Sequence, residues 1–448
     1  MNVGIDLGTT NTVCATLENG KFKLIPLEGK NTILPSAVYY SASGGVLVGN
    51  KALKRKAANP DNCITSAKTF MGDDNKVWHI DNKTFTPTDV ATEILKVVYQ
   101  ACQTNEPITA TITVPAYFTS KQNEATKKAA HDAGFIVNEI LPEPIAAAIA
   151  YGDNSNQTIL VVDLGGGTFD VSVVKTRGDN YITLAKEGDA QLGGDDFDKV
   201  MLDIFLSNIF SLTGVPANTL SRLEDKAIKT KIALSEFDEQ QVNIHNIPPF
   251  TVTKSQFEAK SKHLIHKIQT TVNKVKHMDI DKIVLVGGAA NLPFVRDLIR
   301  NTFNQEPYSN ANLATLVAKG AALKSGLEQL RAGAIVQDIT AHSLGIITNG
   351  NVFTCLIPKG TQIPATRSNI FTTTYDYQTA IKIEIYEGES EVATDNKHYG
   401  EFVLSDIQKA KAGSPDIEIT FEINTGHLLT VSAQDINTNS EDSVIVKV

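Results

Sequence analysis

The sequence is poor in the features that mark disulfide-bonded, metal-binding and membrane proteins. Its longest apolar stretches, such as residues 145–150, are far too short to cross a bilayer, and no charged-then-apolar leader precedes Ile5. No C-x-x-C pair occurs, so a disulfide framework, a metal site and a redox motif all lack support. We therefore expect a protein of the reducing cytoplasm whose fold starts at the first residue. The 448 residues contain only four cysteines: Cys14, Cys63, Cys102 and Cys355.

Basic residues are outnumbered by acidic ones, 41 to 50. The formal net charge is −9 at pH 7, and the two short basic runs, residues 54–56 and 127–128, are typical of solvated helix faces. Such a surface repels phosphate polyanions, so we expect neither a nucleic-acid nor an anionic-membrane partner. Two common nucleotide motifs are missing as well: no G-x-x-x-x-G-K-[ST] occurs, and no G-x-G-x-x-G opens a helix after a strand.

The secondary-structure pattern changes once along the chain. Up to about residue 330, apolar strands alternate with helical segments such as 87–101 and 121–133, which predicts a layered α/β region. After Arg331 short strands separated by turn residues predict an all-β region, which we expect to be a sandwich. A chain of this length exceeds one core. We predict domains at 1–332 and 339–448, joined by a linker at 333–338.

The linker contains two apolar residues, Ile335 and Val336. They either begin a strand or dock on the first domain in one functional state. The sequence leaves both interpretations open.

A glycine-rich loop occurs twice. Residues 4–11 run Gly-Ile-Asp-Leu-Gly-Thr-Thr-Asn, and residues 163–170 run Asp-Leu-Gly-Gly-Gly-Thr-Phe-Asp. Each copy follows an apolar run, so the glycines make a tight hairpin turn where backbone N–H groups can approach an anion closely. One such loop is compatible with an ordinary strand-turn-strand. Two copies predict a cleft that holds phosphate from both sides.

Side chains suited to nucleotide phosphates lie in both loops. Asp6 and Asp163 end the two strands, where a carboxylate can hold a hydrated Mg²⁺ that bridges phosphates. The hydroxyls of Thr9, Thr10 and Thr168 would supply further phosphate contacts.

Further motifs extend the pattern along the chain. They are Ile-Thr-Val-Pro-Ala-Tyr-Phe at 112–118, Leu-Pro-Glu-Pro-Ile-Ala-Ala-Ala at 141–148, Leu-Gly-Gly-Asp-Asp-Phe-Asp at 192–198, Val-Leu-Val-Gly-Gly at 284–288 and Gly-Ala-Ala at 320–322. In this order they resemble the heat-shock 70 kDa chaperone family, the DnaK type, over nearly the whole length. The resemblance implies a two-lobed, actin-like ATPase domain followed by a β-sandwich that binds peptides.

The resemblance also implies catalytic roles. Lys68 matches the catalytic lysine, Glu143 and Asp170 position the attacking water and the metal shell with Thr168, and Asp6 and Asp163 hold Mg²⁺ through water. Phosphoryl transfer depends mainly on positioning and charge neutralisation, which suits this set. Glu143 lies between two prolines, which favour a fixed turn, although it could merely start the alanine-rich helix.

ATP or ADP with Mg²⁺ are the cofactors that the resemblance implies, and K⁺ is a further candidate. The implied nucleotide contacts are Gly8, Thr9, Thr10, Asn11, Gly165, Gly166, Gly167, Thr168, Gly193, Gly194, Lys231, Ser235, Gly287, Gly288 and Asn291.

The adenosine side departs from the family pattern. Lys231 and Ser235 are kept, but Ile228 replaces a glutamate, Asn291 replaces an arginine, and Ala314 replaces an aspartate. Losing a stacking guanidinium and hydrogen-bonding carboxylates should weaken base recognition by on the order of 1–3 kcal/mol. We predict weaker nucleotide affinity and relaxed base selectivity.

The residues that couple the domains are altered too. Pro115 matches the family's proline switch and Asp338 is kept, but the switch arginine is Asn123 here. A basic residue that docks J-domain co-chaperones appears as Glu139. Reversing this charge costs both steering and pairing, which argues against ordinary J-domain stimulation. A dedicated partner with compensating charge stays open, as does a nucleotide exchange factor.

The β region resembles the family's peptide site. Ile346, Phe371, Ile381 and Ile383 would line an apolar pocket near Gln378, although apolar residues alternating along a strand are otherwise ordinary core. The resemblance implies an arch over the groove formed by Asn349 and Thr374, where methionine and alanine are frequent in the family. The family's helical lid would follow the last strand, but the chain stops at Val448. We therefore expect a minimal, lidless member with fast peptide exchange.

The leading hypothesis is a slow ATP hydrolase that acts as a cytoplasmic stress-response chaperone and binds extended apolar segments of unfolded clients. One alternative is a nucleotide-responsive holdase for a dedicated client, with little turnover. Another is a small-molecule kinase or a filament-forming ATPase, because a fold does not fix a function. The appended β region disfavours that last alternative.

Overall fold

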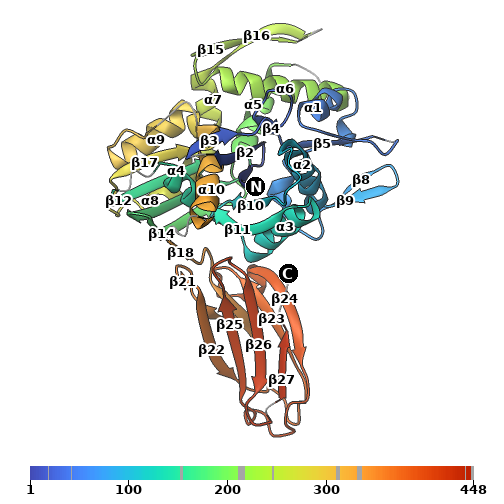
Figure 1. Ribbon diagram of the computed structural model, residues 1–448, viewed down its shortest axis with the longest axis vertical. Coiled ribbons are helices and arrows are strands. Elements are labelled where there is room, and N and C mark those ends of the chain that lie inside the picture. Colours follow the sequence, from blue (N-terminus) through green and yellow to red (C-terminus); the bar gives the residue numbers. More distant parts are fainter. Residues whose placement is uncertain are drawn as a thin grey trace. The chain divides into compact units, whose positions relative to one another are not determined.

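The structure is a computed structural model of the protein. It describes residues 1–18, 20–41, 43–151, 155–209, 217–244, 247–308, 313–329, 335–438 and 440–444. The chain divides into two compact units, whose elements are labelled in Figure 1. Unit 1 comprises Met1–Ala116, Ala125–Tyr181 and Glu187–Ile335, and unit 2 comprises Tyr117–Glu124, Ile182–Lys186 and Val336–Val448.

Unit 1 contains two sheets with related construction. In the first, β1 (Asn2–Leu7) is antiparallel to β2 (Asn11–Glu18) and parallel to β10 (Thr109–Val114). In the second, β12 (Gln157–Leu164) is antiparallel to β13 (Phe169–Arg177) and parallel to β17 (Lys282–Val286). The strand that precedes each glycine-rich loop therefore has the same two kinds of neighbour, so the repeat seen in the sequence is also a repeat of topology.

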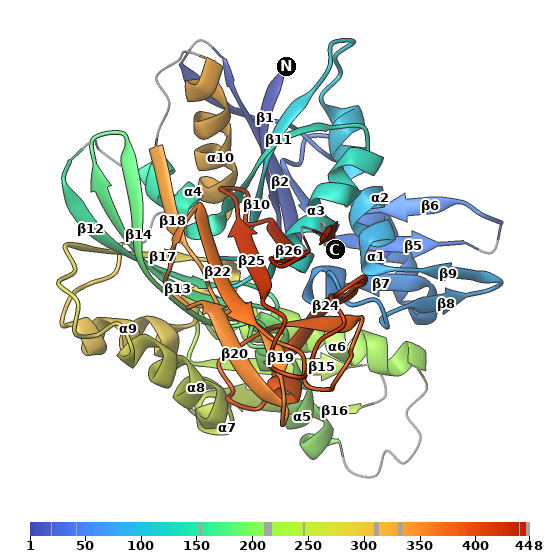
Figure 2. The same ribbon diagram turned by 90° about the horizontal axis from the view of Figure 1, so that it is seen from below.

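Other strands widen the first sheet, and two helices pack closely on it. They are β3 (Lys21–Leu24), β4 (Ile33–Pro35), β11 (Ile136–Pro142), α4 (Glu143–Tyr151) and α10 (Leu313–Gln329). Figure 2 shows α10 beside α4 and β1, the elements that it contacts. A Cβ on Gly320 of α10 would lie 1.8 Å from the carbonyl oxygen of Ala146 in α4. Glycine at this position permits the close helix contact.

The remaining helices of unit 1 follow local sequence signals. Thr86 caps α2 (Pro87–Ala101) through a capping box with Asp89, and Pro87 occupies the first turn. The other helices are α1 (Asn50–Lys56), α5 (Gly194–Asn208), α6 (Ala217–Ala233), α7 (Lys254–Lys260), α8 (Lys262–Asn273), α9 (Pro293–Phe303), and the 3₁₀ turns η1 (Pro60–Asn62), η2 (Ala67–Phe70) and η3 (Gly288–Asn291). Helix α3 (Ser120–Asp132) and strand β14 (Asn180–Asp189) contribute to both units.

Short strands complete unit 1. They are β5 (Ala37–Tyr40), β6 (Val46–Val48), β7 (Cys63–Thr65), β8 (Trp78–Ile80), β9 (Lys83–Phe85), β15 (Glu239–Ile244) and β16 (Ile247–Thr253).

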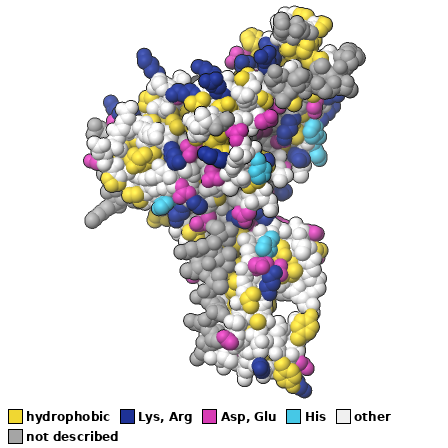
Figure 3. Space-filling model, turned by 90° about the vertical axis from the view of Figure 1, so that its right-hand side faces the viewer, with side chains coloured by type: hydrophobic (Ala, Val, Ile, Leu, Met, Phe, Trp, Pro, Cys, Tyr) yellow, Lys and Arg dark blue, Asp and Glu magenta, His cyan; other side chains and the backbone are white. Residues whose placement is uncertain are grey.

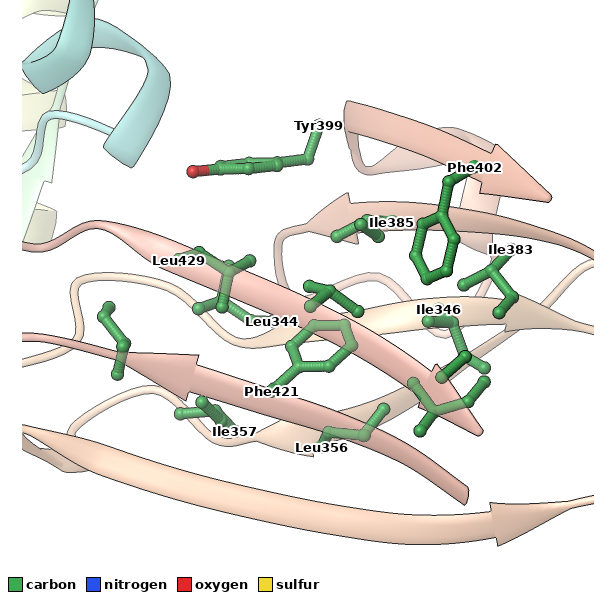
Figure 4. Packing of buried hydrophobic residues seen from close by; sticks show 14 of the residues in the cluster. Leu344, Ile346, Leu356, Ile357, Ile383, Ile385, Tyr399, Phe402, Phe421 and Leu429 are labelled. Carbon is green, nitrogen blue, oxygen red and sulfur yellow. The ribbon is translucent and has the colours of Figure 1, made fainter. Parts of the chain in front are cut away.

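Unit 2 contains two four-stranded antiparallel sheets. One has the order β20 (Val352–Ile357), β19 (Leu344–Thr348), β23 (Ile381–Glu387), β24 (Lys397–Leu404). The other has the order β22 (Ala365–Phe371), β25 (Ile417–Ile423), β26 (Leu429–Asp435), β27 (Ser440–Val444). Figure 4 shows their shared core, to which Phe421 and Leu429 of one sheet and Ile346 and Ile383 of the other contribute. The strand-rich composition predicted after Arg331 is present among these described residues.

The expected linker is only partly described. Residues 333 and 334 lie outside the described residues, as does residue 332. Ile335 and Val336 begin β18 (Ile335–Ile339), which pairs with β21 (Gln362–Ile363) through Asp338 and Ile363. The apolar residues of this segment therefore belong to a strand.

Figure 3 shows basic and acidic side chains interspersed over the visible face, rather than gathered by sign. Among the described residues, no helix combines the length and the apolar character that crossing a bilayer requires.

Candidate functional site

The two glycine-rich loops of unit 1 are built as the same turn. In the first, the N–H of Gly8 donates to the carbonyl oxygen of Asn11 at 3.0 Å; in the second, the N–H of Gly165 donates to that of Thr168 at 3.0 Å. Each turn closes an antiparallel pair of strands. In both cases an aspartate, Asp6 or Asp163, is the next-to-last residue of the strand that enters the turn.

These loops lie against one another, and there is no room for a side chain at Gly166 or Gly167. A Cβ on Gly166 would lie 2.1 Å from Thr10 Oγ1, and one on Gly167 would lie 2.5 Å from Thr69 Oγ1. The loops quoted from separate parts of the sequence therefore form one site.

The start of α5 holds the second loop in place. The N–H of Gly194 donates to Gly165 O, and that of Asp195 donates to Gly166 O, both at 2.8 Å. A Cβ on Gly193 would lie 2.4 Å from Gly166 O. Because the N-terminus of a helix carries partial positive charge, this arrangement favours an anion beside the loop.

Four carboxylates and one lysine form the charged part of the site. Lys68 Nζ lies 2.8 Å from Glu143 Oε1, and both residues are over nine-tenths buried. Burial, and next the charge of Glu143, raise the pKa of Asp6 to about 7. Burial and the charges of Glu143, Asp170 and Asp6 raise the pKa of Asp163 well above its ordinary value. One ammonium does not balance this group, so the site attracts a further cation.

The oxygen donors fit Mg²⁺, which prefers carboxylates and retains several waters. The raised pKa values of Asp6 and Asp163 show that their ionised carboxylates are destabilised in this site. A bound cation would stabilise these ionised forms. Asp170, which faces Asp163 in the register of β12 and β13, is nearly completely buried.

Lys68 is positioned by the short turn η2. The preceding residue, Ser66, has a left-handed φ of 54°, and its hydroxyl donates to Asp195 Oδ2 at 2.5 Å. A small cavity lies beside the lysine and is also lined by Gly8 and Thr9. In the same turn the Phe70 ring packs edge-on against Trp78 at 6.1 Å.

Glu143 is the first residue of α4, so it does start the alanine-rich helix, as one interpretation of the sequence had it. Its carboxylate nevertheless contacts Lys68. The residue therefore both starts the helix and belongs to the charged site.

On the predicted adenosine side, three elements converge on Lys231. Its Nζ lies 2.8 Å from Asp198 Oδ1 and donates to Gly194 O at 3.0 Å. A Cβ on Gly194 would lie 3.4 Å from both this Nζ and Ala289 Cβ, which places η3 nearby. Asp198 was not assigned from the sequence, although it ends the quoted motif at 192–198.

The other predicted adenosine residues differ in exposure. Asn291 and Gly288 are exposed, whereas Ile228 and Ser235 are partly buried. Gly287 has a φ of 82°, and a Cβ there would lie 2.3 Å from Leu164 O. The side chain of Ala314 lies outside the described residues.

Asp338 lies in a buried charge cluster of unit 2. Its Oδ2 is 2.5 Å from Lys186 Nζ and 2.8 Å from His427 Nε2. Burial alone would raise its pKa, but the Lys186 ammonium and the hydrogen bond with His427 hold it well below its usual range. Neither partner was identified from the sequence, because both are far from Asp338 along the chain.

The remaining predicted coupling residues are placed as follows. Pro115 and Asn123 are buried. Within unit 1, Glu139 Oε2 lies 3.6 Å from Lys324 Nζ of α10. Glu139, which the sequence analysis took as a charge reversal, thus has an internal basic neighbour.

In unit 2, the predicted peptide-pocket residues contribute to one apolar cluster. Ile346 and Ile383 are buried in it, and Phe371 and Ile381 are partly buried against it. Asn349 and Thr374 are exposed. Gln378 orders the adjacent loop, since its Oε1 accepts from the N–H groups of Thr374 and Tyr375 and its Nε2 donates to Ala380 O.

A comparison with protein-family models matches residues 2–448 to the family described as Hsp70 protein. The match spans both glycine-rich loops, the charged site and the two sheets of unit 2. The family is that of the resemblance drawn from the sequence motifs. The chain belongs to the Hsp70 family.

Proposed function

We propose that this protein is an ATP-dependent chaperone that hydrolyses ATP to ADP and phosphate in unit 1 and binds extended apolar client segments in unit 2. Hsp70 proteins are chaperones that bind ATP with Mg²⁺ and bind client polypeptides. The observation that carries the catalytic part is the Lys68–Glu143 pair among Asp6, Asp163 and Asp170, next to two facing phosphate-type loops.

Each charged residue has a task in this proposal. The Glu143 carboxylate accepts a hydrogen bond from the attacking water and orients it toward the terminal phosphorus. The Lys68 ammonium, already held by Glu143, offsets negative charge on the phosphoryl oxygens in the transition state. Asp6 and Asp163 would hold Mg²⁺, which supplies charge neutralisation at the phosphates when bound. Asp170 would add a further carboxylate beside the metal.

The loops bind the phosphate chain from two sides. Gly8, Thr9, Thr10 and Asn11 form one side, and the turn at 165–168 forms the other. Their backbone N–H groups and threonine hydroxyls are the donors that a phosphate requires.

Base recognition is proposed to be weak. Lys231, kept from the family pattern, is engaged by Asp198 and Gly194. Ile228 and Asn291 supply neither a carboxylate nor a stacking guanidinium. We therefore infer modest selectivity among purine nucleotides.

The client pocket is proposed at the edge of the apolar cluster of unit 2. Phe371 and Ile381 are partly buried against this cluster, and Ile346 and Ile383 are buried in it. The exposed Asn349 and Thr374 are proposed to flank it, and Gln378 fixes the loop that carries Thr374. Pro115, Asn123 and Asp338 are proposed to transmit the nucleotide state, and Glu139 argues for a dedicated co-chaperone.

The decisive experiment is single-turnover hydrolysis of Mg-ATP with and without an excess of an extended apolar peptide. We expect hydrolysis that rises with peptide and is lost in Lys68→Ala. Lys30→Ala, which removes an exposed lysine of the same unit, is the matched control. Hydrolysis that persists in Lys68→Ala would contradict the catalytic assignment. Turnover that ignores peptide would favour a nucleotide-responsive holdase.

A further inference from the structure

We propose that unit 2 carries a zinc site on the solvent face of one sheet, formed by Glu384, His398 and Glu401. This role is separate from ATP hydrolysis and from client binding. One ligand atom from each residue, an imidazole nitrogen or a carboxylate oxygen, lies within 4.8 Å of the other two. One imidazole, two carboxylates and a water form a coordination that Zn²⁺ accepts.

The two carboxylates lie opposite each other on β23 and β24. Along β23, Ile383 and Ile385 belong to the core that Figure 4 shows, so Glu384 between them points to the other face of the sheet. The register pairs Glu384 with Glu401 of β24. Residues directly opposite in neighbouring strands share a face, with Cβ atoms about 4.5–5.5 Å apart. The sheet therefore brings both carboxylates together on its solvent face.

A β-bulge brings the histidine to the same face. In a regular strand His398 and Glu401, three positions apart, would point to opposite faces. The register of β23 and β24 shifts between Ile385 and Tyr386, where β24 contains the extra residue Tyr399. Such a bulge re-aims the side chains that follow it. As a result, His398 Nε2 lies 3.8 Å from Glu401 Oε2.

A cation already lies between the two carboxylates. Lys382 Nζ is 2.8 Å from Glu401 Oε2 and 3.0 Å from Glu384 Oε1, so these oxygens converge on one point suited to positive charge. Zn²⁺ has twice the charge of an ammonium and also binds the lone pair of an imidazole nitrogen, which an ammonium cannot do. The Lys382 side chain is half exposed, so it can move into solvent when Zn²⁺ takes its place.

Tyr386 positions two of the ligands. Its hydroxyl donates to Glu384 Oε2 at 3.2 Å, and its ring packs edge-on against that of His398, with centroids 5.2 Å apart. Outer contacts of this kind contribute about 10–100-fold to metal affinity. We expect Tyr386→Phe, which keeps the ring and removes the hydrogen bond, to weaken Zn²⁺ binding about tenfold.

A bound ion would clip an edge strand to its neighbour, because β24 ends the sheet order β20-β19-β23-β24. The three ligands come together only in the folded chain, so Zn²⁺ binds the native state in preference to the unfolded one. We expect the melting temperature of unit 2 to rise by roughly 5–10 °C when Zn²⁺ is at about 100 times its dissociation constant.

Two residues provide matched controls. His131 of unit 1 is exposed, and its Nδ1 lies 3.8 Å from Asp132 Oδ1, the same distance as in the proposed site. Among the described residues, no third ligand joins that pair in a metal-binding group. Cys355 is an exposed thiol of β20, in the same sheet as the proposed site. Zn²⁺ affinity should therefore be unchanged in His131→Ala and Cys355→Ser.

The test is calorimetric titration of the full chain with Zn²⁺ in excess Mg²⁺, which competes for the carboxylates of unit 1. We expect the unsubstituted protein to bind, at micromolar Zn²⁺, one ion that His398→Ala loses. Glu401→Gln should weaken this binding by about tenfold or more. Lys382→Met should strengthen it, because the competing ammonium is gone. These three side chains lie at the surface, and circular dichroism identifies any variant that fails to fold.

The proposal is overturned if the unsubstituted protein and His398→Ala bind the same number of Zn²⁺ ions with the same affinity, or if neither binds at micromolar concentrations. It is equally overturned if Lys382→Met binds no more tightly, since the ammonium then does not occupy the metal position. The melting temperature of unit 2 gives a second readout, because Zn²⁺ should raise it in His131→Ala and leave it unchanged in His398→Ala.

Discussion

The Lys68 ammonium lies 2.8 Å from the Glu143 carboxylate, and both groups are buried beside two further carboxylates with raised pKa values. A buried ion pair of this kind costs desolvation, which its mutual attraction only partly offsets. Its position beside the first glycine-rich loop supports the catalytic use proposed above. The pair is the point at which the structure can be tested most directly.

Glu143→Gln should lower the single-turnover rate of ATP hydrolysis about 100-fold, because the amide no longer accepts a proton or orients water as a carboxylate does. Nucleotide affinity should change by less than about threefold, because glutamine keeps the size of glutamate and the substitution removes only one negative charge. Glu18→Gln, on an exposed part of β2, is the control. A variant with unchanged hydrolysis would show that Glu143 is only a helix-starting residue.

Stability without Mg²⁺ should fall as the pH rises from about 4 to about 7. The pKa of Asp6 is about 7 in the folded protein and 3.8 ordinarily, so in this window the native state binds a proton that the unfolded state has lost. The measurement is the melting temperature in EDTA across this range. Asp6→Asn should flatten the slope, and Mg²⁺ should reduce it.

Other groups titrate in the same window, so the comparison with Asp6→Asn is essential. Burial raises the pKa of Glu387 to about 7, so this residue also makes stability fall as the pH rises. Burial lowers the pKa of His342 to about 4, so this residue makes stability rise with pH. An equal slope in wild type and Asp6→Asn would show that Asp6 does not cause the effect.

Gly193→Ala should destabilise unit 1 by about 2–3 kcal/mol, because the new Cβ would lie 2.4 Å from the backbone oxygen of Gly166. Gly165→Ala in the adjoining loop is the matched control, since its nearest contact would be an ordinary 3.7 Å. Denaturant unfolding of both variants makes the comparison. Equal stability of the two would mean that the loop and α5 can separate without cost.

Asp338→Asn should destabilise unit 2 by roughly 3 kcal/mol at pH 7, because the buried Lys186 ammonium loses its counter-charge. The lowered pKa of Asp338 means that its contribution is present above about pH 4 and is lost as the pH falls further. The difference between wild type and variant should therefore shrink in acid. Urea unfolding at pH 7 and pH 3.5 checks both parts.

A double variant tests more strictly whether Asp338 stabilises unit 2 by balancing the charge of Lys186. Lys186→Met combined with Asp338→Leu removes both buried charges and should recover most of the loss. If the double variant is as unstable as the sum of the single ones, the two residues act independently.

The sequence predicted those parts of the structure that depend on local signals. The expected helix at 87–101 is confirmed as α2, because Thr86, Pro87 and Asp89 specify its start within one turn. The two glycine-rich turns are present in the structure. Residue types that set backbone angles or capping bonds act on their neighbours, so they can be recognised without knowing the fold.

Contacts between distant residues could not be predicted in the same way. Spacing gave Asp198 no partner, yet the packing of α5 on α6 brings it 2.8 Å from Lys231 Nζ. Likewise Asp338 was identified, but Lys186 and His427 were not. These pairs depend on which faces of the elements meet, and the charges of the residues alone do not encode that.

The edge-on packing of Trp78 on Phe70 gives this protein a built-in optical reporter. The chain contains one tryptophan, and its ring contacts the same short turn that carries Lys68. Its emission therefore originates from a single, known location. A spectral change on adding nucleotide can be attributed to that turn without labelling the protein or separating overlapping signals.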